Sequence, residues 1–174
     1  MHNVIEKAKK IQLAIFDVDG VLTDGTIYLT DGGEEIKAFN SRDGHGMKML
    51  KASGVELAII TARESRSVKL RAEDFNITLL CQGEENKLKV FESLVTKLKL
   101  DMSSCAYVGD DLVDLPVMTR CGLSICVPSA PTLVKENAHY VTNSEGGQGA
   151  EREVCEMIML SQGTLDAQLE KYLI

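Results

Sequence analysis

Two groups of aspartates are the residues in this chain best placed to do chemistry. Asp17 and Asp19 directly follow the apolar run "LAIF", and Asp110, Asp111 and Asp114 directly follow "CAYVG". Carboxylates this close together repel one another, and burying them is costly unless a cation neutralises them. Oxygen ligands without a neighbouring His or Cys favour Mg²⁺. The two groups therefore predict a divalent metal site, if the fold brings them together.

A calcium-binding loop also begins with Asp-x-Asp, but the sequence excludes that loop here. Its fifth and sixth positions need an oxygen ligand and a glycine, and this chain has Val21 and Leu22 there. An apolar run precedes the motif where such a loop needs a helix. A plain turn or helix cap remains the alternative for each aspartate motif taken singly.

Two further residues are suitably placed for handling phosphate. Thr61 ends the apolar run "VELAIIT", where a hydroxyl and the following backbone N–H can hold a phosphate oxygen. Lys87 lies near the start of a helical pattern, in "GEENKL", where it can neutralise a phosphoryl group and the nucleophile. Taken singly, Thr61 could be only a helix N-cap and Lys87 only a solvated lysine.

The elements that must position these residues alternate between strand-like and helix-like segments. Runs that are apolar on both faces suit a parallel sheet covered on two sides. We therefore expect an α/β fold, a Rossmann-like three-layer sandwich with a central parallel sheet. Ligands bind such sheets beyond the carboxyl ends of the strands, where both aspartate groups fall. The expected strands cover residues 11–16, 55–61, 77–81, 105–109, 123–127 and 139–142, and the expected helices cover residues 45–54, 64–75, 85–100, 112–122, 131–138 and 149–163.

One segment breaks this alternation. Residues 26–39, "TIYLTDGGEEIKAF", contain two β-type runs around Asp-Gly-Gly, which predicts a hairpin. A lone hairpin is marginally stable in water, so we expect it to join subunits of a homo-oligomer. The interval from Asp17 to Thr61 has no room for an inserted cap domain. We expect one domain over residues 1–174, with an open active site and a C-terminal tail at about 163–174.

Composition limits the partners and the compartment. The chain has 26 acidic and 19 basic residues and a net charge of −7, which disfavours general binding to nucleic acid or anionic membranes. We expect neither a membrane span nor a secretion signal, because no apolar run approaches the length of a span and the N-terminal segment is charged. The five cysteines form no C-x-x-C motif, and the three histidines are scattered. Reduced thiols in the cytoplasm are the expectation, and a zinc site is not.

The motifs together resemble those of the haloacid dehalogenase superfamily of phosphatases. "DVDG", "ITAR", Lys87 and "GDDLVD" occur in the family's order and at its spacing. The resemblance implies a phosphomonoesterase that uses Mg²⁺, with Asp17 as nucleophile and Asp19 as general acid and then base. Thr61 would bind the phosphoryl oxygens and Lys87 would balance the phosphate charge. The implied metal ligands are Asp17, the backbone carbonyl of Asp19, and Asp110, supported by Asp111 and Asp114.

Longer matches resemble a capless subgroup of sugar-acid phosphatases, which are typically tetrameric. The resemblance implies hydrolysis of an eight-carbon keto sugar acid phosphate, through an aspartyl phosphate, in lipopolysaccharide precursor synthesis. A nine-carbon sialic-type substrate remains an alternative, because Gln148 stands where the subgroup often has Arg. Arg42 and Arg63 favour the eight-carbon substrate instead. The resemblance also implies that the C-terminal tail covers a neighbouring active site; a frayed end is the alternative. The implied substrate-binding residues are Asp19, Asn40, Ser41, Arg42, Asp43, Gly44, Arg63, Arg71 and Lys87.

Two functions from other classes share part of this pattern. A signalling receiver domain also has a phosphorylated aspartate, Mg²⁺ and a parallel sheet, but it does not require a second acid at Asp19. A non-catalytic oligomerisation module would not need the complete set of motif residues that this chain carries. The pattern therefore favours the enzyme.

Overall fold

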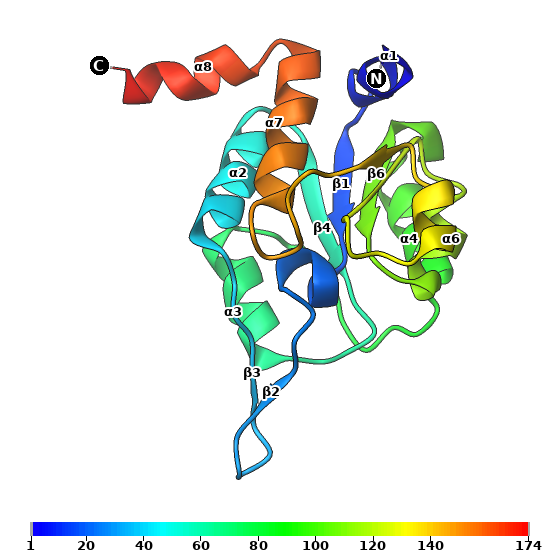
Figure 1. The fold of residues 1–174 in the computed structure, drawn as a ribbon. Coiled ribbons are helices and arrows are strands. Elements are labelled where there is room, and N and C mark those ends of the chain that lie inside the picture. The colour runs from blue at the N-terminus through cyan, green and yellow to red at the C-terminus, as the bar shows by residue number, and fades with distance from the viewer. Residues whose placement is uncertain (1, 174) are drawn as a thin grey trace.

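A six-stranded parallel sheet lies between two layers of helices in the computed structural model, which describes residues 2–173 (Figure 1). The strand order is β5-β4-β1-β6-β7-β8, and every neighbouring pair is parallel. The expected α/β sandwich is confirmed. The strands are β1 (Leu13–Phe16), β4 (Glu56–Ile60), β5 (Leu79–Cys81), β6 (Cys105–Gly109), β7 (Leu123–Cys126) and β8 (Tyr140–Val141).

Each face of the sheet has its own hydrophobic core. One core contains buried residues of α1 (His2–Ala8), α2 (Ser41–Ala52), α3 (Arg66–Asp74) and α7 (Ala150–Gln162). The other contains buried residues of α4 (Lys87–Leu98), α5 (Leu115–Met118) and α6 (Thr132–Glu136). Along β1, Ala14 and Phe16 join the first core, and Leu13 and Ile15 join the second. Burying each large apolar side chain stabilises the fold by about 1.5–3 kcal/mol.

The six expected strands all form, whereas several helices differ from expectation. The helix expected over residues 112–122 is reduced to a 3₁₀ turn, Leu112–Asp114, followed by the short α5. Helix α2 begins at Ser41 because the Asn40 side chain accepts a hydrogen bond from the N–H of Arg42, which caps the helix. Its glycines allow close packing: a Cβ on Gly46 would lie 2.8 Å from Cδ of Arg152 on α7. Helix α1 was not expected, because its segment is largely polar and only Val4 and Ala8 are buried.

The expected hairpin also forms and projects from the body of the molecule (Figure 1). Strands β2 (Tyr28–Leu29) and β3 (Glu35–Ile36) pair antiparallel, with Tyr28 opposite Ile36. Gly33 in the connecting turn has φ +81°, a conformation that glycine adopts without strain. The large apolar side chains of Ile27, Tyr28, Leu29 and Ile36 are exposed. The hairpin therefore presents apolar surface to whatever lies beside it.

The C-terminal segment packs against the chain's own helices. It contains α8 (Leu165–Leu169) and a short 3₁₀ turn at Glu170–Tyr172. The Tyr172 hydroxyl lies 2.7 Å from Nε2 of His45 on α2. Contact between this tail and a neighbouring active site stays a prediction.

The structure also bears on the chain's thiols and its relation to membranes. All five cysteines are free, and four of them are buried. Among residues 2–173, no helix combines the length and apolar character that crossing a bilayer requires.

Candidate active site

The site lies where the carboxyl ends of three central strands meet. Strand β1 lies between β4 and β6, so Asp17, Thr61 and Asp110, which follow these strands, converge at one edge of the sheet. They line a cleft of about 240 Å³. The cleft brings together every residue predicted to be catalytic and every predicted metal ligand: Asp17, Asp19, Thr61, Lys87 and Asp110.

The turn after β1 sets the position of both motif aspartates. It is a tight helical turn, Val18–Leu22, whose backbone departs from helical angles at Asp19 and Gly20. Gly20 has φ +86°, and a Cβ there would lie 2.1 Å from Oδ2 of Asp110. Glycine at this position therefore lets the Asp110 carboxylate come up against the turn. The Thr23 hydroxyl accepts hydrogen bonds from the N–H groups of Gly20 and Gly25, at 3.3 and 3.2 Å, and holds the turn closed.

Asp17 is buried and paired with a cation. Its Oδ2 lies 2.9 Å from Nζ of Lys87, which begins α4 and is itself buried. Burial raises the pKa of Asp17 to about 6, repulsion from Asp114 adds to the rise, and Lys87 opposes it. An ionised, desolvated carboxylate held by a cation is suited to act as a nucleophile.

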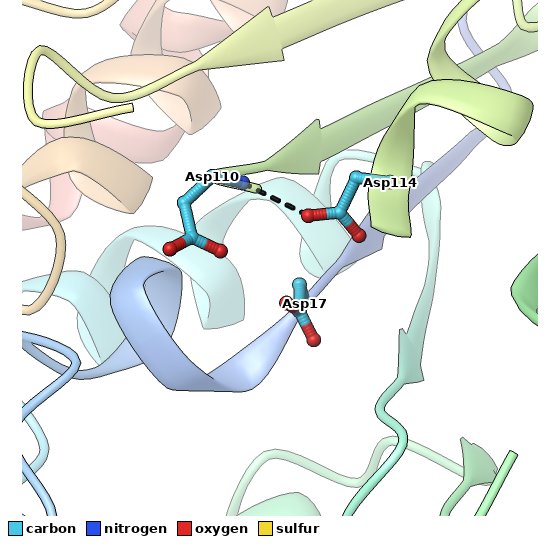
Figure 2. A group of neighbouring side chains, drawn as sticks. All are labelled: Asp17, Asp110 and Asp114. Atoms are coloured by element: carbon cyan, nitrogen blue, oxygen red, sulfur yellow. Dashed lines mark hydrogen bonds between the residues drawn. The ribbon is translucent and has the colours of Figure 1, made fainter. Parts of the chain in front are cut away.

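Three carboxylates face one another at the base of the cleft. Oxygens of Asp17, Asp110 and Asp114 all lie within 4.8 Å of one another, and Figure 2 shows the three side chains converging from β1 and the segment after β6. Burial, followed by repulsion from Asp17, raises the pKa of Asp110 to about 7. A cation bound among the oxygens offsets this repulsion between the carboxylates. The donor set is all oxygen, so Asp17 and Asp110 fit Mg²⁺.

Asp114 has a different task, although it belongs to the same cluster. Its Oδ1 accepts hydrogen bonds from Lys87 and the Tyr107 hydroxyl, each at 2.7 Å. Its Oδ2 accepts from the N–H group of Asp110 at 3.0 Å (Figure 2) and from that of Asp111 at 3.1 Å. With four donors on its two oxygens, Asp114 orients Lys87 and the loop after β6 and has little capacity left for a metal ion. Its support of the metal site stays a prediction. Tyr107, which the sequence analysis missed, is part of this arrangement.

Thr61, Asp111 and Arg63 also line the cleft. Thr61 is buried, and its hydroxyl accepts a hydrogen bond from the N–H of Arg63 at 3.4 Å. Asp111 is exposed, and its side chain accepts from the N–H of Leu112 at 2.7 Å. The Arg63 side chain is 47% exposed, and its Nε lies 3.9 Å from Oδ2 of Asp19. These groups are accessible to a ligand that enters the cleft.

Two charged residues of the hairpin form ion pairs with residues of the cleft, and the sequence analysis missed both. Lys37 forms ion pairs with Asp19 and with Glu35. Glu35 also pairs with Arg63. The available signal was their spacing, since residues two apart on a strand share a face.

The other predicted substrate-binding residues lie outside the lining of this cleft. Asn40 donates through Nδ2 to the Gly147 carbonyl, and its own carbonyl accepts from Arg71 at 3.0 Å. The Arg71 guanidinium stacks 4.1 Å from the centre of the Phe75 ring, so it faces inward. The first turn of α2 contains the exposed residues Ser41 and Arg42 and the buried Gly44. A second depression, separate from the cleft, is lined by Arg42 and Gln148. Contact of these residues with substrate stays a prediction.

Asp43 faces α7 rather than the cleft. It is buried, and its two oxygens accept hydrogen bonds from the N–H groups of Gly149 and Arg152, at 3.1 and 3.0 Å. These contacts provide acceptors for backbone N–H groups at the start of α7, which have no partner within the helix. Glu151 in the same turn is fully buried beside the Asp43 carboxylate. Burial, followed by the charge of Asp43 and a hydrogen bond to it, raises the pKa of Glu151 well above 4.5, which favours the neutral acid.

Comparison with known proteins identifies the family. A haloacid dehalogenase-like hydrolase model matches residues 72–152. The 3-deoxy-D-manno-octulosonate 8-phosphate phosphatase of Escherichia coli strain K12 is 51% identical over 94% of this chain and 87% of its own length.

Solved structures agree with the sequence relatives. The phosphatase of that name from Yersinia pestis is 47% identical, with a TM-score of 0.93 over 94% of this chain and 89% of its own. The phosphatase of that name from Moraxella catarrhalis is 42% identical, with a TM-score of 0.97 over 99% of both chains. That structure is a complex with magnesium, phosphate and KDO, the abbreviation for 3-deoxy-D-manno-octulosonate. The chain therefore belongs to the haloacid dehalogenase-like hydrolases, in the branch that contains these phosphatases.

Proposed function

We propose that the protein is a Mg²⁺-dependent phosphomonoesterase that hydrolyses 3-deoxy-D-manno-octulosonate 8-phosphate to the free sugar acid and phosphate. The observation that carries the reaction type is the buried Asp17 carboxylate, held 2.9 Å from Lys87 in a cleft shared with Asp19, Thr61 and Asp110. The substrate follows from the relative in Escherichia coli, which is 51% identical and named for that activity.

In the first step, an oxygen of Asp17 attacks phosphorus and the bond from phosphorus to the sugar oxygen breaks. Asp19 donates a proton to the departing sugar alkoxide, so the sugar acid leaves with a neutral hydroxyl. The product on the protein is an aspartyl phosphate. Lys87 balances the charge on the phosphoryl group, and the Thr61 hydroxyl donates to one of its oxygens.

In the second step, water hydrolyses the aspartyl phosphate. Asp19, now a carboxylate, takes a proton from the attacking water. The new bond from water oxygen to phosphorus replaces the bond to Asp17, and inorganic phosphate leaves. Magnesium, held by Asp17, Asp110 and the backbone carbonyl of Asp19, would lower the repulsion between the anionic nucleophile and the anionic phosphate.

A panel of sugar phosphates tests the proposed substrate. With Mg²⁺ present, phosphate release should be at least about 10-fold more efficient, in kcat/KM, for 3-deoxy-D-manno-octulosonate 8-phosphate than for a nine-carbon sialic-type sugar acid 9-phosphate. A chelator should stop release from every substrate.

Three results would contradict parts of this proposal. A preference for nine carbons would favour the alternative raised by Gln148. Phosphorylation of the protein without turnover would favour a phospho-acceptor, and full activity in chelator would exclude the metal role.

We also infer that the protein is a homo-oligomer, a tetramer by its likeness to the capless subgroup, joined through the hairpin. The hairpin's exposed apolar side chains, on a two-stranded element that is marginal alone, support this inference. The domain range, residues 1–174, is likewise proposed as one unit. A cytoplasmic location is favoured by the five free cysteines.

Charging the hairpin should dissociate the oligomer. Tyr28 and Ile36 share the face opposite Glu35 and Lys37, so Tyr28→Glu with Ile36→Glu leaves the face toward the cleft unchanged. Light scattering should show a smaller mass for this variant. Leu160→Glu, at an exposed apolar position on α7, is the matched control and should keep the parent mass. An unchanged mass in the hairpin variant, or a monomeric parent, would refute the interface.

A further inference from the structure

Lys37 has an unusual environment for a lysine on a protruding hairpin. Its side chain is only 4% exposed. The ammonium group forms ion pairs with Oδ1 of Asp19 and, at 2.7 Å, with Oε1 of Glu35. A surface lysine normally keeps its charged end in water, so this one is held in place by the two carboxylates.

Glu35 links this lysine to Arg63, which lines the cleft. Its Oε2 pairs with the Arg63 guanidinium, while its Oε1 pairs with Lys37. Glu35 thereby holds one cation on each side of the Asp19 carboxylate. Asp19 forms ion pairs with these same two cations. Lys37 is closer to Asp19 than Arg63 is, since Arg63 lies 3.9 Å away.

The position of Asp19 matters because its side chain is not otherwise fixed by its element. It lies at the interruption of the turn after β1, with backbone angles outside the helical region, and its side chain is 26% exposed. A general acid must come within about 2.6–3.2 Å of the oxygen that it protonates. A misplacement of about 1 Å can cost about 100-fold in rate.

We infer that Lys37 is a positioning residue that holds the Asp19 carboxyl group for proton transfer to the leaving oxygen, with Glu35 holding Lys37. The inference rests on the proposed acid and base role of Asp19. Its consequence is that the hairpin completes the active site in addition to its proposed part in assembly. The ion pairs of Lys37 with Asp19 and of Glu35 with Arg63 hold the hairpin strand against the site.

The test depends on whether the leaving group needs a proton. A sugar alkoxide does, whereas p-nitrophenolate leaves readily without one. Lys37→Met should lower the rate of aspartyl-phosphate formation from 3-deoxy-D-manno-octulosonate 8-phosphate, measured in single turnovers, by about 10- to 100-fold. It should lower the same rate for p-nitrophenyl phosphate by less than about 3-fold. The rate of this first step is measured because the later hydrolysis, in which Asp19 acts as base, is common to both substrates. Lys37→Arg should recover part of the loss. Glu35→Gln should show the same split, a larger loss for the sugar phosphate than for p-nitrophenyl phosphate, but with smaller losses than Lys37→Met.

Controls separate this role from others. Lys89→Met, at an exposed lysine on α4, should match the parent on both substrates. Asp19→Asn should show the same split more strongly than Lys37→Met. Melting temperature and mass are measured for each variant, to confirm that folding and assembly are intact.

Each contrary result overturns a defined part of the inference. Equal losses in the rate of aspartyl-phosphate formation from both substrates in a folded Lys37→Met variant, or no loss, would overturn the positioning role. Weaker substrate binding with an unchanged rate of aspartyl-phosphate formation would make Lys37 a substrate-binding residue instead. If Asp19→Asn shows no split, the acid role of Asp19 fails, and the inference fails with it. If Asp19→Asn shows the split and Lys37→Met does not, only the inference about Lys37 fails.

Discussion

Replacing Asp17 with asparagine is expected to reduce phosphate release by about three orders of magnitude or more. The amide has the size of the carboxylate but is not a competent nucleophile toward phosphorus, so the aspartyl phosphate cannot form. Single-turnover measurements with Mg²⁺ and 3-deoxy-D-manno-octulosonate 8-phosphate should show neither the covalent species nor its product. The fold should persist, because the change also removes the repulsion between Asp17 and Asp114 that raises the pKa of Asp17.

Two comparisons make this result interpretable. Asp31→Asn, in the exposed hairpin turn, removes the same charge outside the cleft and should leave turnover unchanged. Thermal unfolding should show an intact cooperative transition for Asp17→Asn. Substantial activity in a well-folded Asp17→Asn protein would refute the nucleophile assignment, because no other group in the proposal forms the phosphoryl bond.

Replacing Glu151 is expected to stabilise the protein, most strongly above neutral pH. The side chain is fully buried beside the Asp43 carboxylate, and both its burial and the Asp43 charge disfavour its ionised form. Its folded-state pKa is raised above the ordinary 4.5, so the folded protein holds a proton that the unfolded chain releases. The free energy of unfolding therefore falls as pH rises from about 4.5 towards the folded-state pKa. Glu151→Met should remove this fall and add about 1–3 kcal/mol at pH 8.

Urea unfolding across pH 5 to 9 checks this expectation. A gain of 1 kcal/mol corresponds to about 2–4 °C in melting temperature for a chain of this length. Glu151→Gln separates charge from polarity, since it removes the pH slope but keeps a buried polar group. Glu136→Gln, at an exposed position, should change little. If Glu151→Met were less stable than the parent at pH 8, the hydrogen bond between the Glu151 carboxyl group and Asp43 would outweigh the cost of burying the acid.

The sheet and the main motifs were predictable because their signals are local and repeated. Runs that are apolar on both faces indicate buried strands or buried helices. Because these runs are short and alternate with helical patterns, they favour strands of a parallel sheet. Once β1 and β6 are parallel neighbours, Asp17 and Asp110 must lie at the same edge. The convergence of the carboxylates therefore follows from topology, before any side chain is placed.

The parts that escaped prediction depend on contacts between distant segments. Lys37 looks like an ordinary hairpin lysine until the hairpin lies against the turn after β1. Glu151 looks like a solvated residue in the first turn of a helix, and only the packing of α7 against α2 buries it. Arg71 likewise has the pattern of an exposed helix residue, but it turns inward over Phe75. Charge and spacing do not reveal such burial, because it is decided by the partner surface.

The close approach of Gly20 to Asp110 restricts how this enzyme can be altered. Any side chain at position 20 would collide with a carboxylate oxygen, and the left-handed backbone there would be strained as well. Directed evolution of substrate range therefore has almost no freedom in the turn after β1. New selectivity has to arise around the rim of the cleft, from the Arg63 segment and from hairpin positions other than Glu35 and Lys37, where side chains can change without displacing Asp17 or Asp110.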